Sequence, residues 1–274
     1  MEGVPQFFDD PRDAARYRRP AHLPGVECYR AHIVRHAFEP HSHDGFGLGA
    51  IETGAERFRY RGAEHLASSG ALLLMNPGEL HTGRAETDGG WRYRMLYVDP
   101  DLAERVTGER GWHFRDAVRQ NPAAARRATA LLDALWAARE SLAFDSLLAE
   151  LLALFRPHAT VGRGAHGGAA PRFGPVLDYL HARIAERLTL DDLATVAGLS
   201  PWHFLRSFRA QYHVSPQQML MALRLAEAKR LLAAGVRPAQ VAAAAGLADQ
   251  AHLTRAFACR YGVTPARYQR QLRA

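Results

Sequence analysis

The chain of 274 residues lacks the features that mark secreted and membrane proteins. Its two cysteines, Cys28 and Cys259, are too far apart for a metal-binding or redox motif and need no oxidising compartment. No stretch approaches the roughly 18 consecutive apolar residues of a membrane span. Residues 1–20 have no apolar run, so no signal peptide is expected there. We therefore expect a cytoplasmic protein with reduced thiols and no membrane partner.

Excess basic charge is absent from most of the chain and concentrated at its end. Residues 172–274 hold 14 Lys and Arg against 6 Asp and Glu, whereas residues 1–171 hold 21 against 22. The net charge of +7 therefore belongs to the C-terminal third. This distribution is expected if that third alone meets a polyanion.

The first half of the chain has a β-type pattern followed by two helices. From Val26 to Asp99, short apolar or alternating runs are separated by Gly, Pro, Asn and Asp without βαβ alternation, which favours a barrel or sandwich. Two Ala- and Leu-rich helices should follow, over about 121–138 and 142–155. The expected strands are His32–Phe38, Gly47–Glu52, Glu56–Tyr60, Ala71–Met75 and Tyr93–Val98.

The rest of the chain predicts a linker and then an all-helical domain. Residues 157–171 are rich in glycine, which is typical of a flexible linker. Helices are expected over about 173–186, 190–197, 201–211, 216–234, 238–245 and 249–260, and from Pro265 onward. The fold class is thus α+β, with one domain over 1–156 and a second over 172–274.

The helical domain contains an internal repeat, which fixes its architecture. The run Leu193–Phe208 is echoed by Val241–Phe257, and Tyr212–Pro216 is echoed by Tyr261–Pro265. Each copy has an apolar-periodic helix, then Gly-Leu, then a second helix that carries an arginine, which is the pattern of a helix-turn-helix. The helix between the copies would span roughly 28 Å, which suits two recognition helices in adjacent major grooves about 34 Å apart.

The second helix of each copy has one apolar and one exposed face. In the first copy, Trp202, Arg206 and Arg209 share the face opposite Phe204 and Phe208. Exposed arginine on such a helix suits a major-groove reader, because it can donate two hydrogen bonds to guanine. In the second copy the corresponding positions are poorer in base-reading groups, so the first helix should supply most of the discrimination. The corresponding positions of the second copy are Ala251, Thr254, Arg255 and Ala258. They lie opposite the apolar residues Leu253, Phe257 and Tyr261.

These motifs resemble the DNA-binding domain of the AraC/XylS transcriptional regulators over the 103 residues from Arg172. The resemblance rests on both Ala-Gly-Leu turns, the helix around Arg224–Leu232 and the closing Tyr261–Tyr268. Leu205 departs from the family, where a polar base-reader often stands, and Ala248–Gln250 replaces a common serine-rich turn. By resemblance, the base or nearby backbone contacts fall on Trp202, Leu205, Arg206, Gln250, Ala251, Thr254 and Arg255, to which the exposed face adds Arg209.

Three histidines are the candidate binding residues of the N-terminal domain. His41 and His43 form a His-x-His pair, and His81 follows a distant Asn-Pro-Gly turn. Residues 26–99 resemble a cupin barrel, in which two such segments line the mouth of the pocket. The barrel's metal-binding carboxylate is missing, because Gly47 and Leu48 occupy its place; Glu52 and Glu79 are weak substitutes.

Three roles for these histidines stay open: contact with a small-molecule effector, metal binding, or hydrogen bonds to the backbone. A neighbouring strand alternates aromatic and basic side chains, so either Trp91 and Tyr93 or Arg92 and Arg94 would face inward. We take His41, His43, His81, Trp91 and Tyr93 as the candidate effector site and expect no resident cofactor. The histidine triad remains the alternative metal site.

The leading hypothesis is a transcription regulator and not an enzyme, in which an effector-sensing barrel controls a DNA-binding unit. Its expected partners are double-stranded DNA, a small-molecule effector, a second copy bound through the 121–155 helices, and RNA polymerase if it activates. One rival is a metal-dependent cupin enzyme with an accessory helical domain. Another is an architectural DNA-binding protein whose barrel only dimerises.

Overall fold

The computed structural model describes residues 10–162 and 173–273. In this part of the chain, nine strands form one antiparallel sheet, and β9 (His113–Phe114) and β11 (Ala159–Thr160) form a small second one. The strands of the large sheet are β1 (Ala14–Arg18), β2 (Val26–Ile33), β3 (Phe38–His41), β4 (Phe46–Tyr60), β5 (Ala63–Ser68), β6 (Ala71–Met75), β7 (His81–Ala85), β8 (Trp91–Val98) and β10 (Val118–Gln120).

The main strand path runs β1-β2-β8-β4-β6-β10, with β5 and β7 on the second half of β4 and β3 on β7. The expected sheet-rich domain is confirmed, but the pairings among the described strands do not close it into a barrel. β4 replaces two expected strands, because a register shift between Ile51 and Thr53 and a positive φ at Gly54 let one strand bend and change partners.

The strand expected over His32–Phe38 is wrong. β2 ends at Ile33, and residues 34–37 turn toward β3. The cause lies in Asp13, whose buried carboxylate accepts hydrogen bonds from the backbone N–H groups of residues 34–36. Those groups are therefore not available for a strand ladder.

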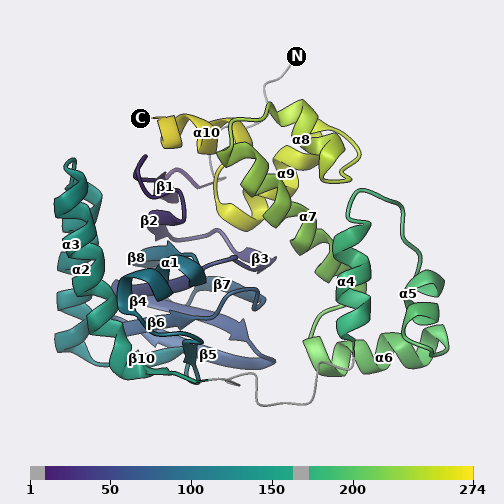
Figure 1. Cartoon of the computed structure of the whole chain (residues 1–274), viewed down its shortest axis with the longest axis horizontal. Helices are drawn as coiled ribbons and strands as arrows, with labels where there is room; N and C mark the ends of the chain where they lie inside the picture. Colours follow the sequence, from purple (N-terminus) through teal and green to yellow (C-terminus); the bar gives the residue numbers. More distant parts are fainter. Residues whose placement is uncertain (1–9, 163–172, 274) are drawn as a thin grey trace.

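Helices cover the outer face of the sheet. α1 (Pro100–Thr107) follows β8, and α2 (Pro122–Ala137) and α3 (Ser141–Phe155) form an antiparallel pair beside the strands (Figure 1). Their apolar side chains share one core with the outward residues of the sheet, such as Leu48, Leu72 and Leu96. The apolar stripe from Phe144 to Phe155 is therefore largely used inside the chain, since Phe144, Leu148, Leu151, Leu152 and Phe155 are all buried.

The C-terminal region contains the two expected helix-turn-helix units. The first lies beside the sheet domain and the second lies over β1 to β3, with α7 passing between them (Figure 1). α4 is shorter than expected, because the Arg224 guanidinium binds the carbonyls of Ile184 and Glu186 in the turn that follows it. The helices are α4 (Gly174–Ala182), α5 (Leu190–Val196), α6 (Pro201–Tyr212), α7 (Pro216–Ala233), α8 (Pro238–Ala244), α9 (Gln250–Tyr261) and α10 (Pro265–Arg273).

The two helix-turn-helix units pack differently. The first has its own core around Phe173, Phe204 and Phe208. The second, including Phe257 and Tyr268, shares one continuous core with the inner face of the sheet. The second unit is therefore docked on the N-terminal domain through apolar contacts.

Part of the expected linker is structured. After the short 3-10 helix η1 (Arg156–His158), β11 pairs with β9. Residues 163–171 of the expected linker lie outside the described residues. None of the helices described is both long and apolar enough to cross a membrane.

Candidate DNA interface and effector site

The exposed face of α6 carries the residues expected to read DNA. Ser200 caps the helix, with its hydroxyl accepting from the His203 backbone N–H, and Pro201 occupies the first turn. Trp202 is 59% exposed, which is unusual for so large an apolar side chain. The Arg206 guanidinium lies over its ring, 5.1 Å from the ring centre. This cation–π contact holds the arginine along the helix and away from the core.

The other residues expected on α6 differ in exposure. Arg209 is exposed and continues the face of Trp202 and Arg206, whereas Leu205 is half-buried. On the opposite face, the expected burial of Phe204 and Phe208 is confirmed. The face of Trp202, Arg206 and Arg209 thus offers one aromatic and two cationic groups to solvent.

The corresponding face of α9 presents fewer groups. Asp249 caps the helix by accepting from the His252 backbone N–H at 2.6 Å. Gln250 and Arg255 are exposed, and Ala251 is half-buried. Thr254 is 9% exposed, and its hydroxyl donates to the Gln250 carbonyl at 2.8 Å. The expected core residues Leu253, Phe257 and Tyr261 are buried.

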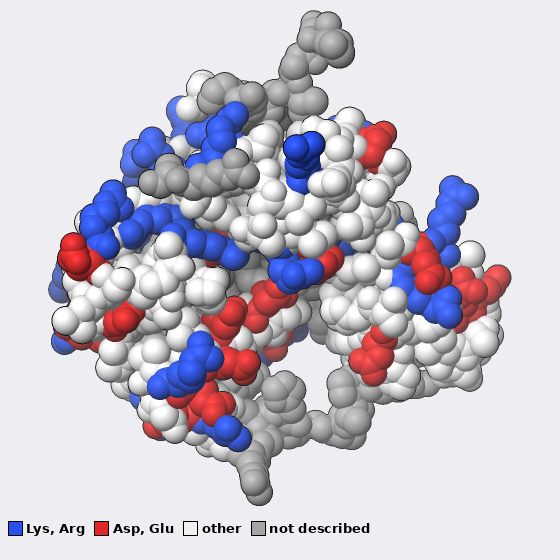
Figure 2. All heavy atoms as spheres, turned by 45° about the horizontal axis from the view of Figure 1, so that its top comes forward, with Lys and Arg blue, Asp and Glu red and all other residues white. Residues whose placement is uncertain are grey.

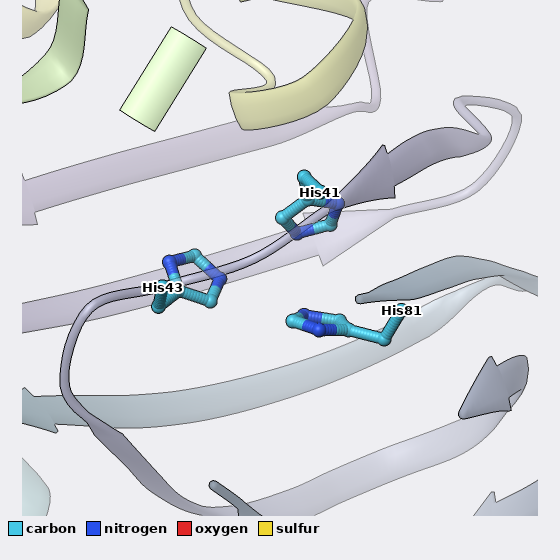
Figure 3. A group of neighbouring side chains, drawn as sticks. All are labelled: His41, His43 and His81. Atoms are coloured by element: carbon cyan, nitrogen blue, oxygen red, sulfur yellow. The ribbon is translucent and has the colours of Figure 1, made fainter. Parts of the chain in front are cut away.

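The three histidines of the N-terminal domain converge on one point. His41 ends β3, His43 lies in the loop after it, and His81 begins β7. Their rings face one another (Figure 3), and one ring nitrogen from each lies within 4.8 Å of the others. The His41 and His81 ring centres are 4.3 Å apart.

Two of these rings are oriented by the backbone. Nδ1 of His41 lies 2.8 Å from the Glu39 carbonyl, and Nδ1 of His81 lies 3.1 Å from the Glu79 carbonyl. Because a carbonyl oxygen only accepts, each Nδ1 is the donor, and in the neutral ring Nε2 keeps a lone pair. Burial, followed by the charges of neighbouring groups, lowers the pKa of His41 and His43, and burial lowers the pKa of His81. All three imidazoles are therefore neutral at pH 7.

Nε2 of His43 is buried and has no hydrogen-bond partner among the described residues. An unsatisfied buried polar atom costs about 1–3 kcal/mol. The arrangement fits a transition-metal ion, because neutral imidazole nitrogens anchored through Nδ1 are typical ligands of such ions.

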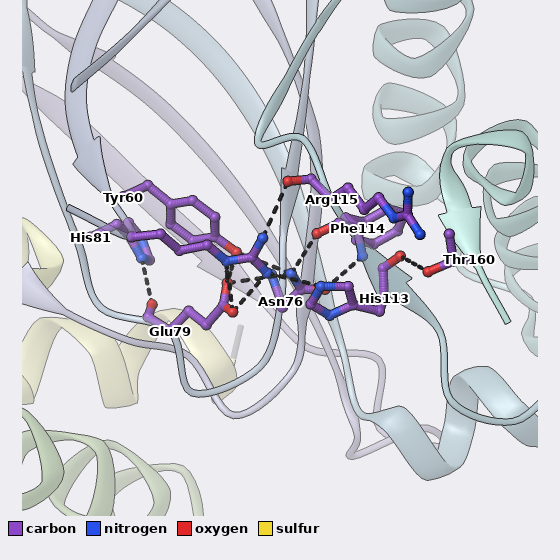
Figure 4. A network of polar contacts seen from close by, with 9 residues as sticks. Tyr60, Asn76, Glu79, His81, His113, Phe114, Arg115 and Thr160 are labelled. Carbon is purple, nitrogen blue, oxygen red and sulfur yellow. Dashed lines mark hydrogen bonds and ion pairs between the residues drawn. The ribbon is translucent and has the colours of Figure 1, made fainter. Parts of the chain in front are cut away.

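The carboxylates considered as further ligands have other partners. Glu79 pairs with Arg61 at 2.7 Å and accepts from the Tyr60 hydroxyl, and Asn76 donates to the same carboxylate at 3.3 Å (Figure 4). Glu52 pairs with Arg94 at 2.8 Å. The histidine cluster therefore takes no carboxylate from either residue.

The structure settles which face of β8 lies inward. Trp91 and Tyr93 are buried in the inner core and stack at 5.7 Å, whereas Arg94 faces α2, where it pairs with Asp133 at 2.6 Å. Nε1 of Trp91 is buried without a partner among the described residues. Nearby on the inner face, burial raises the pKa of Glu56 to about 8.

A cleft separates the sheet from the first helix-turn-helix unit. It has a volume of about 820 Å³, and the space-filling view shows an opening between these two parts of the molecule (Figure 2). Of the candidate effector residues, His81 lines this cleft, together with the arginines and apolar side chains Arg59, Arg61, Leu80, Met219 and Leu223. His43 lines a second cavity of about 340 Å³, next to Lys229 and Tyr261.

Sequence reasoning missed the polar contact between the domains. Lys229 on α7 reaches into the sheet domain and pairs with the buried Glu27 of β2. Glu27 also accepts from the Tyr268 hydroxyl at 2.6 Å and from Arg19 at 3.0 Å. Burial alone would raise the pKa of Glu27, but the charges of Lys229 and Arg19 outweigh it and lower that pKa. The one signal in the sequence is that Lys229 is the only lysine.

Two family models match the chain. The model described as an AraC-like ligand binding domain matches residues 23–155, and a helix-turn-helix domain model matches residues 193–271. The first match covers the sheet domain from β2 to α3, and the second covers most of the region from α5 to α10.

Similar whole proteins are transcriptional regulators. The chain is 30% identical over 237 residues to the uncharacterized HTH-type transcriptional regulator YbfI of Bacillus subtilis, covering 83% of this chain and 86% of YbfI. It is 24% identical over 243 residues to the HTH-type transcriptional activator RhaS of an Enterobacter species, covering 84% and 86%. Unsaturated fatty acid-bound ToxT from Vibrio cholerae shares the fold with a TM-score of 0.58 at 11% identity, covering 90% of this chain and 95% of ToxT.

Proposed function

The chain belongs to the AraC family of transcriptional regulators, and on that premise we propose that α6 reads base edges in double-stranded DNA while an effector bound between the domains sets the DNA affinity. The observation that carries the proposal is the exposed stack of Trp202 and Arg206, which points away from a well-packed core. As a regulator of transcription it acts in the cytoplasm, by binding and not by catalysis.

The two recognition helices should have different roles in DNA binding, because their side chains differ in exposure to solvent. On α6, Trp202, Arg206 and Arg209 reach solvent, and Leu205 sits at the edge of that face. The α9 group of Gln250, Ala251, Thr254 and Arg255 offers fewer free donors, because the Thr254 hydroxyl is engaged. We therefore assign most sequence discrimination to α6 and phosphate positioning with limited readout to α9.

For the effector we propose an apolar carboxylic acid in the 820 Å³ cleft. Its wall combines apolar side chains with Arg59, whose guanidinium meets no carboxylate among the described residues, and a free guanidinium favours a carboxylate ligand. ToxT has been solved with an unsaturated fatty acid and with (E)-4-(8-methylnaphthalen-1-yl)but-3-enoic acid, both of them carboxylic acids. Of the expected effector residues, His81 lines this cleft, and Trp91 and Tyr93 lie in the inner core of the sheet.

DNA reading is tested by fluorescence anisotropy with labelled DNA from upstream of the gene and with a scrambled duplex, over a salt series. Arg206→Ala should weaken binding to the preferred duplex by about 1–3 kcal/mol and leave binding to scrambled DNA nearly unchanged. The matched control is Arg126→Ala, which removes an exposed charge from α2. Equal losses on both duplexes would assign Arg206 to a phosphate contact and contradict base reading.

The effector proposal is tested in the same assay with oleate as the probe. We expect oleate to change the DNA affinity of the wild type and to have little effect on Arg59→Ala. Arg92→Ala, which removes an exposed arginine from β8, should respond like the wild type. An oleate response that is the same in Arg59→Ala and the wild type would place the acid elsewhere.

We also propose that the regulator is a homodimer and, if it activates, that it contacts RNA polymerase. Leu142, at the start of α3, is 80% exposed and leaves an apolar group outside the core. Sedimentation at micromolar concentration should give twice the mass of the chain, and a monomer mass would contradict the dimer.

The second candidate is a metal-dependent cupin enzyme, and the observation that favours it is the convergence of His41, His43 and His81. Here the three imidazoles would hold the ion, and the metal would supply Lewis-acid or redox chemistry. Catalytic turnover that requires stoichiometric iron or manganese at these histidines would support this candidate, whereas metal binding without turnover would not.

A further inference from the structure

The histidine cluster lies at the contact between the sheet domain and the second helix-turn-helix unit. The ring centre of Tyr261 on α9 is 5.9 Å from that of His41 and 6.2 Å from that of His43. The preceding residue, Arg260, donates to the Pro40 carbonyl at 3.1 Å and pairs with Glu39 at 2.9 Å. The segment that supplies His41 is therefore the segment that holds α9.

We propose that His41, His43 and His81 bind one divalent transition-metal ion of zinc-like preference, and that the bound ion stabilises the docking of α9 on β3. Metal binding stands independently of the proposed DNA-reading function. Any consequence of the metal for DNA affinity rests on that function.

The Nε2 atoms of the three histidines are available to bind a metal ion. The Nδ1 groups of His41 and His81 are fixed on backbone carbonyls, which directs their Nε2 lone pairs, and the Nε2 of His43 is buried without a partner among the described residues. Tetrahedral zinc with Zn–N bonds of about 2.0–2.1 Å places its nitrogens about 3.4 Å apart. The observed spread of up to 4.8 Å would close with small side-chain rotations.

The surroundings leave room for the ion and for a fourth ligand. The cavity of about 340 Å³ next to His43 is also lined by Asp44, Lys229 and Tyr261. The positive charge of Lys229 is offset by its ion pair with Glu27, so it does not by itself exclude a cation. A water molecule or a small anion in this cavity would complete four-coordination, as in zinc sites with three protein ligands.

The positions of the three ligands in the chain explain how a bound ion would stabilise the docking of α9 on β3. A bound ion ties the end of β3 and the loop after it to the start of β7. This fixes Glu39 and Pro40, the two residues that hold Arg260. The same ion would not touch α6, whose core receives the partly buried Leu80 from the sheet domain and none of the three ligands. Metal should therefore order the second helix-turn-helix unit selectively.

The binding test uses full-length protein stripped with a chelator and titrated with Co²⁺, followed by the visible absorption of four-coordinate cobalt and by displacement with Zn²⁺. We expect one equivalent per chain. His81→Gln and His43→Gln should each weaken binding at least about tenfold, while His22→Gln, which changes a histidine paired with Asp145 on α3, should bind like the wild type. No binding, or binding unchanged in both triad variants, would overturn the proposal.

The docking test is amide hydrogen exchange with and without Zn²⁺. Exchange in α9 and α10 should slow with metal in the wild type and not in His81→Gln, while α6 serves as the internal control. Metal binding without slower exchange in α9 would refute the docking half. Sequence-specific DNA binding of the metal-free protein is measured separately, so a failure of the DNA-reading proposal leaves the cobalt result standing.

Discussion

Replacing Glu56 should stabilise the protein relative to the wild type, and this gain in the free energy of unfolding should grow as the pH rises. Glu56 is 7% exposed on the inner face of the sheet, and burial raises its pKa from 4.5 to about 8. Below pH 4.5 the carboxyl is protonated in both the folded and the unfolded chain, so no penalty arises. Between pH 4.5 and 8 the unfolded chain loses a proton that the folded chain keeps, and the free energy of unfolding falls. At pH 7 this loss amounts to about 3 kcal/mol.

Glutamine has nearly the same shape and stays neutral, so Glu56→Gln removes the penalty. Urea unfolding followed by tryptophan fluorescence at pH 5, 6, 7 and 8 gives the difference in unfolding free energy between variant and wild type. That difference should grow from below about 1 kcal/mol at pH 5 to about 3 kcal/mol at pH 7. Glu64→Gln, at a 57% exposed side chain on β5, is the control and should show no such growth. Parallel pH curves for wild type and Glu56→Gln would refute the reasoning.

Two other substitutions test the contacts that fix the fold. Asp13→Ala should lower the free energy of unfolding by about 2–4 kcal/mol, because three backbone donors at residues 34–36 lose their acceptor; a change within error in urea unfolding would contradict this. Lys229→Met should cost about 3–5 kcal/mol by leaving Glu27 buried without its lysine, and adding Glu27→Gln should restore part of the loss. If the double variant is no more stable than Lys229→Met, the ion pair is not the cause.

The helical region was predictable because its signals are local. Ser200 followed by Pro201, and Asp249 before α9, mark helix starts with side chains that cap the backbone, and both caps are present. The apolar spacing placed Phe204 and Phe257 in the core. An internal repeat adds a second sample of the same pattern, which is why both helix-turn-helix units could be identified from sequence.

The sheet domain was harder to predict, because distant residues decide where its strands end. The turn after β2 depends on Asp13, which lies 21 residues before Val34. The missed strand β1 pairs with β2 in full register, although its sequence, Ala-Ala-Arg-Tyr-Arg, has no large aliphatic side chain. The helix α1 was also missed, although the sequence marked it with Pro100 in the first turn and Gly108, which is left-handed, after its end.

The candidate sites show the same contrast between features that the sequence predicts and features that depend on contacts between distant residues. The sequence identified His41, His43 and His81 as a group, and the structure brings them together. It left the inward face of β8 open, because alternation alone does not fix which side is buried. That Lys229 is the only lysine marked it as unusual but did not identify Glu27 as its partner, since 202 residues separate the two along the chain.

The composition of the interdomain contact bears on how the regulator could switch. Lys229 lies between the rings of Tyr17, Tyr97, Tyr261 and Tyr268, at 5.0 to 5.7 Å, and pairs with Glu27. The desolvation of a buried pair offsets most of its Coulomb attraction, so such a contact specifies one geometry strongly while adding little net free energy. A ligand that shifts the domains must therefore act mainly against the apolar core that the second helix-turn-helix unit shares with the sheet. Because the first unit has a core of its own, that shift would change the placement of α9 relative to α6 without unfolding either helix.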